Sequence, residues 1–179
     1  MKNSKGYTLI ELLAVMIVMI TVGLIVATIL VSSLRGSNKT NTINTIRQNG
    51  NYAILQISKM LEFAQSFGGV YDPQTSSYRT DCSSPSSQYN SIKITSFDNG
   101  TTIFSCDLPN AKISSNSASL INSSEVTLSQ CYFTCSRNVS VPPTIGINFT
   151  LSQKSATAPF EKRETINFQT SVLMRNLNK

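Results

Sequence analysis

The feature that most constrains this chain is an uncharged, mostly aliphatic run at residues 12–34. No charged residue lies between Glu11 and Arg35. As a helix that rises ~1.5 Å per residue, the run would be roughly 35 Å long, which is enough to cross the ~30 Å hydrocarbon layer of a bilayer. We therefore predict a membrane-spanning helix near the amino terminus.

Glu11, at the edge of this run, needs a partner. An ionised carboxylate within or beside a membrane helix costs about 2.5–3.5 kcal/mol on insertion scales, so it is usually paired with a cation. The cations on its near side are two lysines and the amino terminus of the chain. If the chain were cut after Gly6, a new α-amine would form on Tyr7, and Glu11 would become the fifth residue of the mature protein.

The segment around this bond reads KGYTLIELL from Lys5 to Leu13 and resembles the class III signal of type IV pilins and pseudopilins. In that family a short basic leader that ends in Gly is removed by the prepilin peptidase, an aspartyl protease of the membrane, and the new terminal residue is N-methylated. The resemblance implies processing between Gly6 and Tyr7. It also implies that Glu11 pairs with the terminal amine of a neighbouring subunit during filament assembly.

The resemblance is specific over residues 5 to about 25 and generic beyond them. Tyr7 stands where Phe is usual, and Thr28 stands where many major pilins have a helix-kinking Pro. An ordinary secretory signal would have a shorter apolar region followed by a small-residue cleavage site. A plain single-pass anchor would explain the length of the run but neither Gly6 nor Glu11.

Helical periodicity resumes beyond the span. Short polar residues and a glycine at 35–38 weaken the helix, and apolar residues then recur at alternating spacings of three and four, as on one face of a helix. The members of this stripe are Ile43, Ile46, Gly50, Ala53, Ile57, Met60, Ala64 and Phe67. We predict that the helix ends at Gly68-Gly69. The stripe is too weak for a coiled coil, so we expect the helix to lie on a small sheet.

The next part of the chain alternates connections with strands. Residues 71–90 and most of 110–124 are rich in short polar residues without a period, which is typical of surface connections. Alternation over residues 92–108 around the turn signal Asp98-Asn99-Gly100 predicts a hairpin. The apolar phase then changes after Leu128, which predicts a bulge near Ser129-Gln130.

The last third carries the clearest β pattern. Apolar residues alternate strictly over residues 145–151 and again over 166–172, so two antiparallel strands are expected there. A long amino-terminal helix whose apolar stripe is covered by an antiparallel sheet is an α+β fold, and the pilin resemblance implies the same arrangement. The expected organisation is a leader at 1–6, a transmembrane and filament-core helix at 7–34, an amphipathic helix at 35–69 and a β domain with disulfides at 70–179.

Four cysteines, at Cys82, Cys106, Cys131 and Cys135, follow the predicted span. An even number in an exported domain favours two disulfides, each worth about 2–4 kcal/mol. A zinc site of four thiolates needs short paired spacings such as C-x-x-C. Here one pair has three residues between its cysteines and the other has 23, so we predict disulfides and no metal.

The pairing depends on whether Cys131 and Cys135 share a strand. On one strand their Cα atoms would be about 13 Å apart at ~3.3 Å per residue, whereas bridged Cα atoms are usually about 4.4–6.8 Å apart. Each cysteine must then pair with Cys82 or Cys106, and we slightly favour Cys106 with Cys135 and Cys82 with Cys131. A tight turn at 131–135 would instead allow Cys131 to pair with Cys135.

The composition excludes several kinds of chemistry. The chain has no His and no Trp, which removes His-based triads, His metal sites and the commonest general base. Its carboxylates are isolated, mostly in turns, and no glycine-rich phosphate loop is present. The formal charge of +6 falls to +4 without the leader (13 basic minus 9 acidic residues), and the scattered Lys and Arg do not support a nucleic-acid partner. We predict neither an enzyme nor a cofactor.

The sequence thus favours a minor type IV pilin. Such a subunit would wait in the cytoplasmic membrane, be trimmed by the prepilin peptidase, and join other pilin subunits in an extracellular filament with the help of the pilus assembly machinery. Two alternatives stay open. A type II secretion pseudopilin would share the leader and Glu11, and a module at the filament tip, for adhesion or DNA uptake, would carry its binding function in the loops at 71–90 and 110–124.

Overall fold

A computed structural model describes residues 6–82, 87–137, 141–154 and 164–175. The chain divides into two compact units, Met1–Asn41 and Thr42–Lys179, which we call the amino-terminal and the carboxyl-terminal unit. One helix and nine strands are seen in the described residues. They are α1 (Leu9–Glu62), β1 (Ser66–Asp72), β2 (Ser77–Arg79), β3 (Ser91–Thr95), β4 (Thr101–Asp107), β5 (Lys112–Ser115), β6 (Ala118–Ser119), β7 (Val126–Ser136), β8 (Thr144–Gln153) and β9 (Thr165–Leu173).

The fold is α+β, as predicted, because one long apolar helix is followed by antiparallel sheets. Helix α1 continues through residues 35–38, where the sequence weakens it, and the Thr40 hydroxyl donates to the carbonyl of Gly36 at 3.0 Å. Such a bond satisfies the side chain without interrupting the helical ladder.

The predicted end of the helix at Gly68-Gly69 is wrong, because α1 ends at Glu62 and both glycines lie in β1. The amide of Gln65 already donates to the carbonyl of Thr95 in β3 at 2.9 Å. Gly69 marks a β-bulge instead, with a φ of +117° and the Arg79 carbonyl oxygen only 2.5 Å from where a Cβ would stand. Glycine is needed here for a bulge, not for a helix cap.

The first sheet has six antiparallel strands in the order β2-β1-β3-β4-β5-β6. It contains the predicted hairpin β3–β4, whose turn places Asn99 at a φ of 62°. The prediction of unstructured connections at 71–90 and 110–124 is wrong in part, because the hairpins β1–β2 and β5–β6 lie there. Strands β2 and β6 are short and bury no side chain, so pairing with the neighbouring strand rather than apolar alternation defines them.

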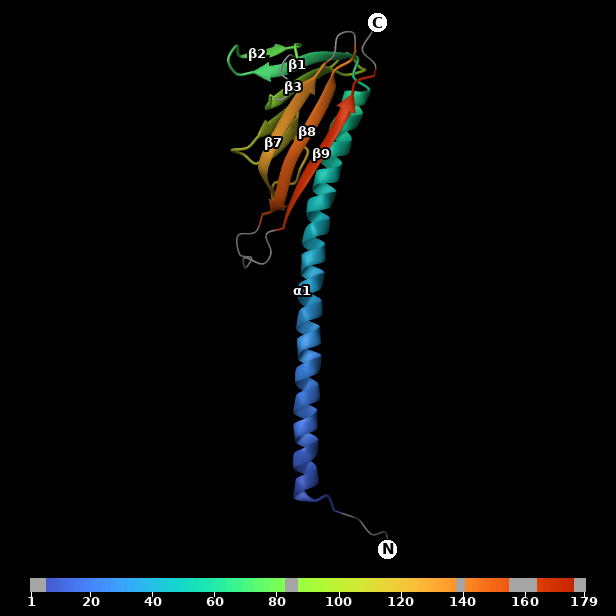
Figure 1. Cartoon of the computed structure of the whole chain (residues 1–179), viewed down its shortest axis with the longest axis vertical. Coiled ribbons are helices and arrows are strands. Elements are labelled where there is room, and N and C mark those ends of the chain that lie inside the picture. Colours follow the sequence, from blue (N-terminus) through green and yellow to red (C-terminus); the bar gives the residue numbers. More distant parts are fainter. Residues whose placement is uncertain (1–5, 83–86, 138–140, 155–163, 176–179) are drawn as a thin grey trace. The chain divides into compact units, whose positions relative to one another are not determined.

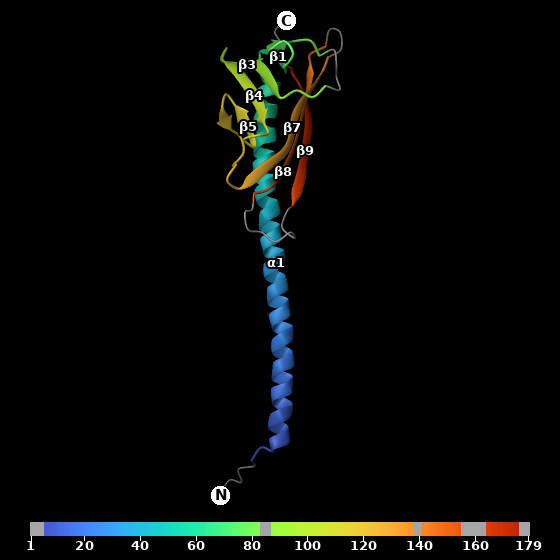
Figure 2. The same ribbon diagram turned by 90° about the vertical axis from the view of Figure 1, so that its left-hand side faces the viewer.

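The second sheet has the order β7-β8-β9. Its register confirms the antiparallel pairing of β8 with β9 and the bulge, which lies between Leu128 and Gln130 in β7. Figure 1 shows β7, β8 and β9 beside the carboxyl-terminal turns of α1, and Figure 2 shows β3, β4 and β5 as a separate group from β7, β8 and β9.

The core of the carboxyl-terminal unit lies between the two sheets and α1. The helix buries Thr42, Ile46, Gly50, Ala53, Ile57 and Leu61. The predicted burial of Ile46, Gly50, Ala53 and Ile57 is confirmed, but Thr42 and Leu61 are buried in place of Ile43 and Met60. The last two predicted members, Ala64 and Phe67, are also buried, although they follow the end of α1. The predicted stripe repeats every seven residues, whereas a straight helix of 3.6 residues per turn drifts by ~20° per heptad from such a repeat.

Two disulfides join the sheets. Cys82, after β2, pairs with Cys135 in β7 at a Cα separation of 5.3 Å, and Cys106 in β4 pairs with Cys131 in β7 at 5.6 Å. Cys131 and Cys135 share a strand and do not pair with each other, as predicted.

The favoured partner assignment, however, is wrong. Tyr89 forms an antiparallel bridge with Phe133, midway between the two cysteines of β7. Cys82, which precedes Tyr89, therefore approaches β7 on the Cys135 side. Chain after Tyr89 lies on the other side, where the Cys106 amide donates to the carbonyl of Asn90 at 2.8 Å.

Candidate functional site: the first turn and apolar surface of the amino-terminal helix

Gly6 and Tyr7 precede the helix in a non-helical segment. Tyr7 is 88% exposed, and a Cβ built on Gly6 would meet nothing within 4 Å. Proteases cleave exposed, extended chain far more readily than helices. The bond between Gly6 and Tyr7, at which the pilin resemblance predicts processing, is thus sterically open.

Glu11 lies in the first turn of α1 and bonds back to Thr8. Its carboxylate oxygen Oε2 accepts from the Thr8 amide at 3.2 Å and from the Thr8 hydroxyl at 3.1 Å, and its own amide donates to the Thr8 hydroxyl oxygen at 3.4 Å. This reciprocal arrangement is a capping box, in which Thr8 is the N-cap and Glu11 is residue N3. A carboxylate here also interacts favourably with the helix dipole.

Thr8 is the residue that our interpretation of the sequence missed. The pattern Thr-x-x-Glu directly before an apolar run is a recognisable capping signal. It gives Glu11 a role within its own chain. Thr8 is neutral, however, so the capping box satisfies the hydrogen-bonding capacity of the carboxylate without compensating its charge.

The helix that follows is apolar on every side. The large apolar side chains of residues 9–34 are all between 49% and 81% exposed, and none is buried. A helix that is hydrophobic all round is normally covered by protein or lipid. This part of α1 is long and apolar enough to cross a membrane.

Both threonines of the apolar segment bond to its own backbone. The hydroxyl of Thr21 donates to the carbonyl of Val18 at 2.9 Å, and that of Thr28 donates to the carbonyl of Ile25 at 2.8 Å. A Cβ built on Gly23 would meet nothing within 4 Å. Small and self-satisfied polar residues allow helices to approach each other closely in lipid.

Among the carboxylates that are isolated in the sequence, Asp72, Asp98 and Asp107 accept hydrogen bonds from backbone amides two or three residues later in their turns. The pKa of Asp72 is lowered from its ordinary value of 3.8, first by the backbone amide of Gln74 and then by the Arg79 side chain. The pKa of Asp107 is lowered by the side chain and then the amide of Asn110. Within the described parts of the chain, no three side chains of the His, Cys, Asp or Glu type lie close enough together to hold a metal ion. Another isolated carboxylate of the sequence, Glu161, lies outside these parts.

The predicted site residues thus fall into two groups. Gly6, Tyr7 and Glu11 lie together around the start of α1, and the four cysteines lie in the carboxyl-terminal unit. Comparison of the chain with protein-family models, curated proteins and solved structures found no match. What the chain does is therefore inferred from these residues and their geometry.

Proposed function

We propose that this chain is a structural subunit, a minor pilin, of a type IV pilus-like filament, and that it assembles through α1. The observation that carries the proposal is an apolar surface on every side of the amino-terminal part of α1, next to an exposed Gly6–Tyr7 bond and headed by Glu11. Such a helix needs a covering on all sides. Lipid supplies it before assembly, and the helices of other pilin subunits supply it in the filament.

Processing by the prepilin peptidase removes residues 1–6 and leaves the amine of Tyr7 one residue before the N-cap Thr8. The amine adds a positive charge at the positive end of the helix dipole, which is unfavourable within one subunit. Glu11 of a neighbouring subunit compensates this charge, and the amine in turn compensates the carboxylate. The capping box holds that carboxylate at the start of its helix, where a neighbour can reach it.

The carboxyl-terminal unit fits an exported location. Two disulfides join its sheets, and disulfides form and persist outside the reducing cytoplasm. The assembled subunit thus displays this unit on an extracellular filament, after a stage in the cytoplasmic membrane with the peptidase and the assembly machinery. A type II secretion pseudopilin would share all these features, and deletion of the chain's gene would then stop protein secretion rather than pilus formation.

The first experiment is mass spectrometry of the protein from cells that contain a prepilin peptidase. We expect a mature chain that begins at N-methyl-Tyr7. A mature chain that still begins at Met1 would contradict the proposal.

A second experiment separates the charge of Glu11 from its capping role. Glu11→Gln keeps an acceptor for the Thr8 amide but has no charge, whereas Thr8→Val keeps the charge and removes the hydroxyl of the capping box. We expect Glu11→Gln and Glu11→Ala to be cleaved and inserted normally but to be excluded from filaments. Thr8→Val should lose only the ~1 kcal/mol typical of an N-cap and still assemble. If Glu11→Gln assembles normally, the charge has no role in assembly.

A further inference from the structure

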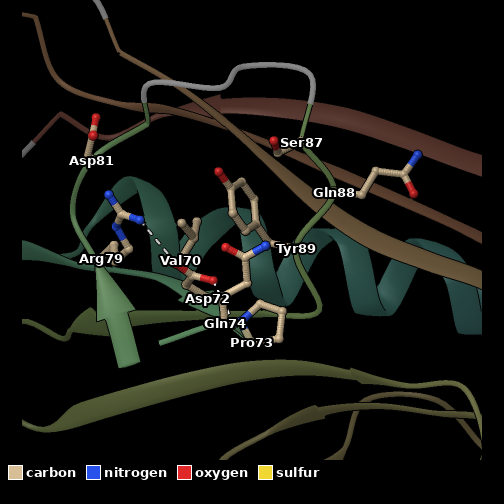
Figure 3. A pocket seen from close by; sticks show the side chains of 9 residues that line it. All are labelled: Val70, Asp72, Pro73, Gln74, Arg79, Asp81, Ser87, Gln88 and Tyr89. Atoms are coloured by element: carbon tan, nitrogen blue, oxygen red, sulfur yellow. Dashed lines mark hydrogen bonds and ion pairs between the residues drawn. The ribbon is translucent and has the colours of Figure 1, made fainter. Parts of the chain in front are cut away.

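A hollow of about 390 Å³ opens beside the hairpin β1–β2, and the proposed filament role makes no use of it. The described residues that line it lie between Val70 and Tyr89, and Figure 3 shows them around Tyr89. Small-molecule sites usually have volumes of about 300–1,000 Å³, so this hollow is large enough for one small ligand. We call it the hairpin hollow.

The walls of the hairpin hollow are held in place by bonds to other elements. Tyr89 exchanges two backbone hydrogen bonds with Phe133, each of 2.8 Å. The disulfide from Cys82 to Cys135 ties the other end of this stretch to the same strand. Side chains carried on backbone that is already anchored, as at Tyr89, lose little conformational entropy when a ligand binds.

The charges of the hairpin hollow disfavour several classes of ligand. Arg79 and Asp72 form an ion pair at 3.1 Å, and the second oxygen of Asp72 accepts the Gln74 amide at 2.9 Å. These two charges cancel, and Asp81 leaves one net negative charge, which disfavours an anion. Asp72 is already occupied by its donors, so a divalent cation would find only one free carboxylate, fewer ligands than such ions need.

The remaining groups suit a neutral molecule with many hydroxyls. Asp81 and Ser87 line the hollow, and neither makes a side-chain hydrogen bond with another described residue. In Figure 3 the ring of Tyr89 projects between Arg79 and Ser87, whereas Gln88 points away from it. A sugar hydroxyl both donates and accepts, as this mixture of donors and acceptors requires, and the C–H face of a sugar ring is an apolar surface that can lie on an aromatic ring.

We propose that the hairpin hollow binds a neutral sugar unit. Asp81 accepts hydrogen bonds from its hydroxyls, Ser87 and the outer N–H groups of Arg79 donate to them, and Tyr89 supports the face of the ring. This inference does not depend on the filament role. The carboxyl-terminal unit could bind a sugar whether or not α1 assembles into a filament.

The experiment titrates the full chain with glucose, galactose, mannose and N-acetylglucosamine in turn, with amide resonances of the carboxyl-terminal unit observed by NMR. The chain is held in dodecylphosphocholine micelles, because a detergent with a sugar headgroup would compete for the site. We expect at least one sugar to shift the resonances of Asp81, Ser87 and Tyr89 at millimolar concentration. No shift with any of the four sugars up to tens of millimolar would overturn the proposal.

Variants show whether binding occurs in the hairpin hollow. Asp81→Asn should weaken binding at least about fivefold, as expected for loss of a charged hydrogen-bond acceptor. Tyr89→Leu should weaken it similarly, and Ser87→Ala tests the site independently if Tyr89→Leu does not fold. Glu125→Gln is the control, because it removes the same charge from an exposed residue just before β7, at the end of that strand far from Cys135. It should bind the sugar as wild type does. Equal affinity in all variants, or shifts produced by inorganic phosphate rather than by sugars, would overturn the proposal.

Discussion

Substitution of Gly50, which contacts Phe168, is the most direct test of how α1 packs on the second sheet. Gly50 is buried in the helix, and a Cβ added to it would stand 2.5 Å from Cε2 of Phe168 and closer still to Cε1 and Cζ. Carbon atoms in contact are ~3.5–4.0 Å apart. The ring would have to retreat by at least about 1.0 Å (3.5 minus 2.5) to admit one methyl group.

The ring has no room for such a retreat. Phe168 is 7% exposed and stacks on Phe149 with their centroids 5.1 Å apart and their planes at 18°. Phe149 is itself 1% exposed. A movement of Phe168 would thus disturb the core that the second sheet shares with the helix.

The expected change in stability is the balance of two terms. Gly→Ala favours a helix by about 1 kcal/mol, whereas overpacking a close-packed core costs about 1–3 kcal/mol. Three ring atoms overlap the new methyl group, so the cost belongs at the upper end of that range. We expect Gly50→Ala to lower the free energy of unfolding by about 2 kcal/mol, or the melting temperature by roughly 4–8 °C.

The assay is urea unfolding of the oxidised full chain in detergent, followed by tyrosine fluorescence. Five of the six tyrosines lie in the carboxyl-terminal unit, so the signal reports on that unit. Asn51→Ala is the matched control, because it raises helix propensity at the next, exposed position. It should leave stability unchanged or slightly raised.

A double-mutant cycle isolates the contact itself. Phe168→Leu removes the ring at its own cost, and Gly50→Ala in that background should cost much less than it does alone, with a coupling of about 1 kcal/mol or more. If Gly50→Ala is as stable as Asn51→Ala, or if the two changes add without coupling, α1 does not lie on β9 as described.

Three further predictions concern the carboxyl-terminal unit. Non-reducing peptide mapping should recover Cys82 linked to Cys135 and Cys106 linked to Cys131; a peptide that links Cys106 to Cys135 would refute the pairing. Gly69→Ala should destabilise the unit in thermal melts by more than the ~1 kcal/mol range of ordinary surface changes, because its φ is +117° and its Cβ would meet the Arg79 carbonyl; wild-type stability would exclude the bulge geometry. Asp72 has a lowered pKa, so its contribution to stability should be full above its unfolded pKa near 3.8 and lost as the pH falls through its folded pKa. The difference in free energy of unfolding between wild type and Asp72→Asn should therefore be constant near neutral pH and vanish in acid. A difference that grows in acid would refute the assignment.

Sequence by itself determined the elements whose signals are local and strong. The uncharged run at 12–34 can only be a helix that needs covering, and the alternation at 145–151 and 166–172 could be recognised as paired strands because the residue period matches a half-buried sheet. The bulge in β7 was visible because one extra residue moves every later side chain to the opposite face. Glu11 drew attention as a lone carboxylate at the edge of the apolar run. The capping role of Thr8 was predictable from the same short segment, because Thr-x-x-Glu before an apolar run is a capping signal.

Tertiary structure decided what short polar segments do. The hairpin β5–β6 turns through Asn116 and Ser117, both of which have a positive φ. The side-chain oxygen of Asn116 also accepts a hydrogen bond from the Ile103 amide in β4 at 2.8 Å. Its strands are too short for an apolar alternation to reveal. In β5 the side chains of Ile113 and Ser114 are buried, whereas both residues of β6 are exposed, so β6 is defined by its pairing with β5. Strand β2, which has only three residues, could not be predicted from the sequence for the same reason.

Partner choices between distant residues also needed the tertiary structure. Spacing could exclude a bond between Cys131 and Cys135 only on the condition that they share a strand. The bridge from Tyr89 to Phe133 is what fixes the side of β7 that each other cysteine approaches. The two glycines after α1 carry the same letters as a helix cap, and only pairing with β3 turns them into a bulge. Local sequence limits the backbone of each segment, whereas contacts between segments select among the arrangements that those limits allow.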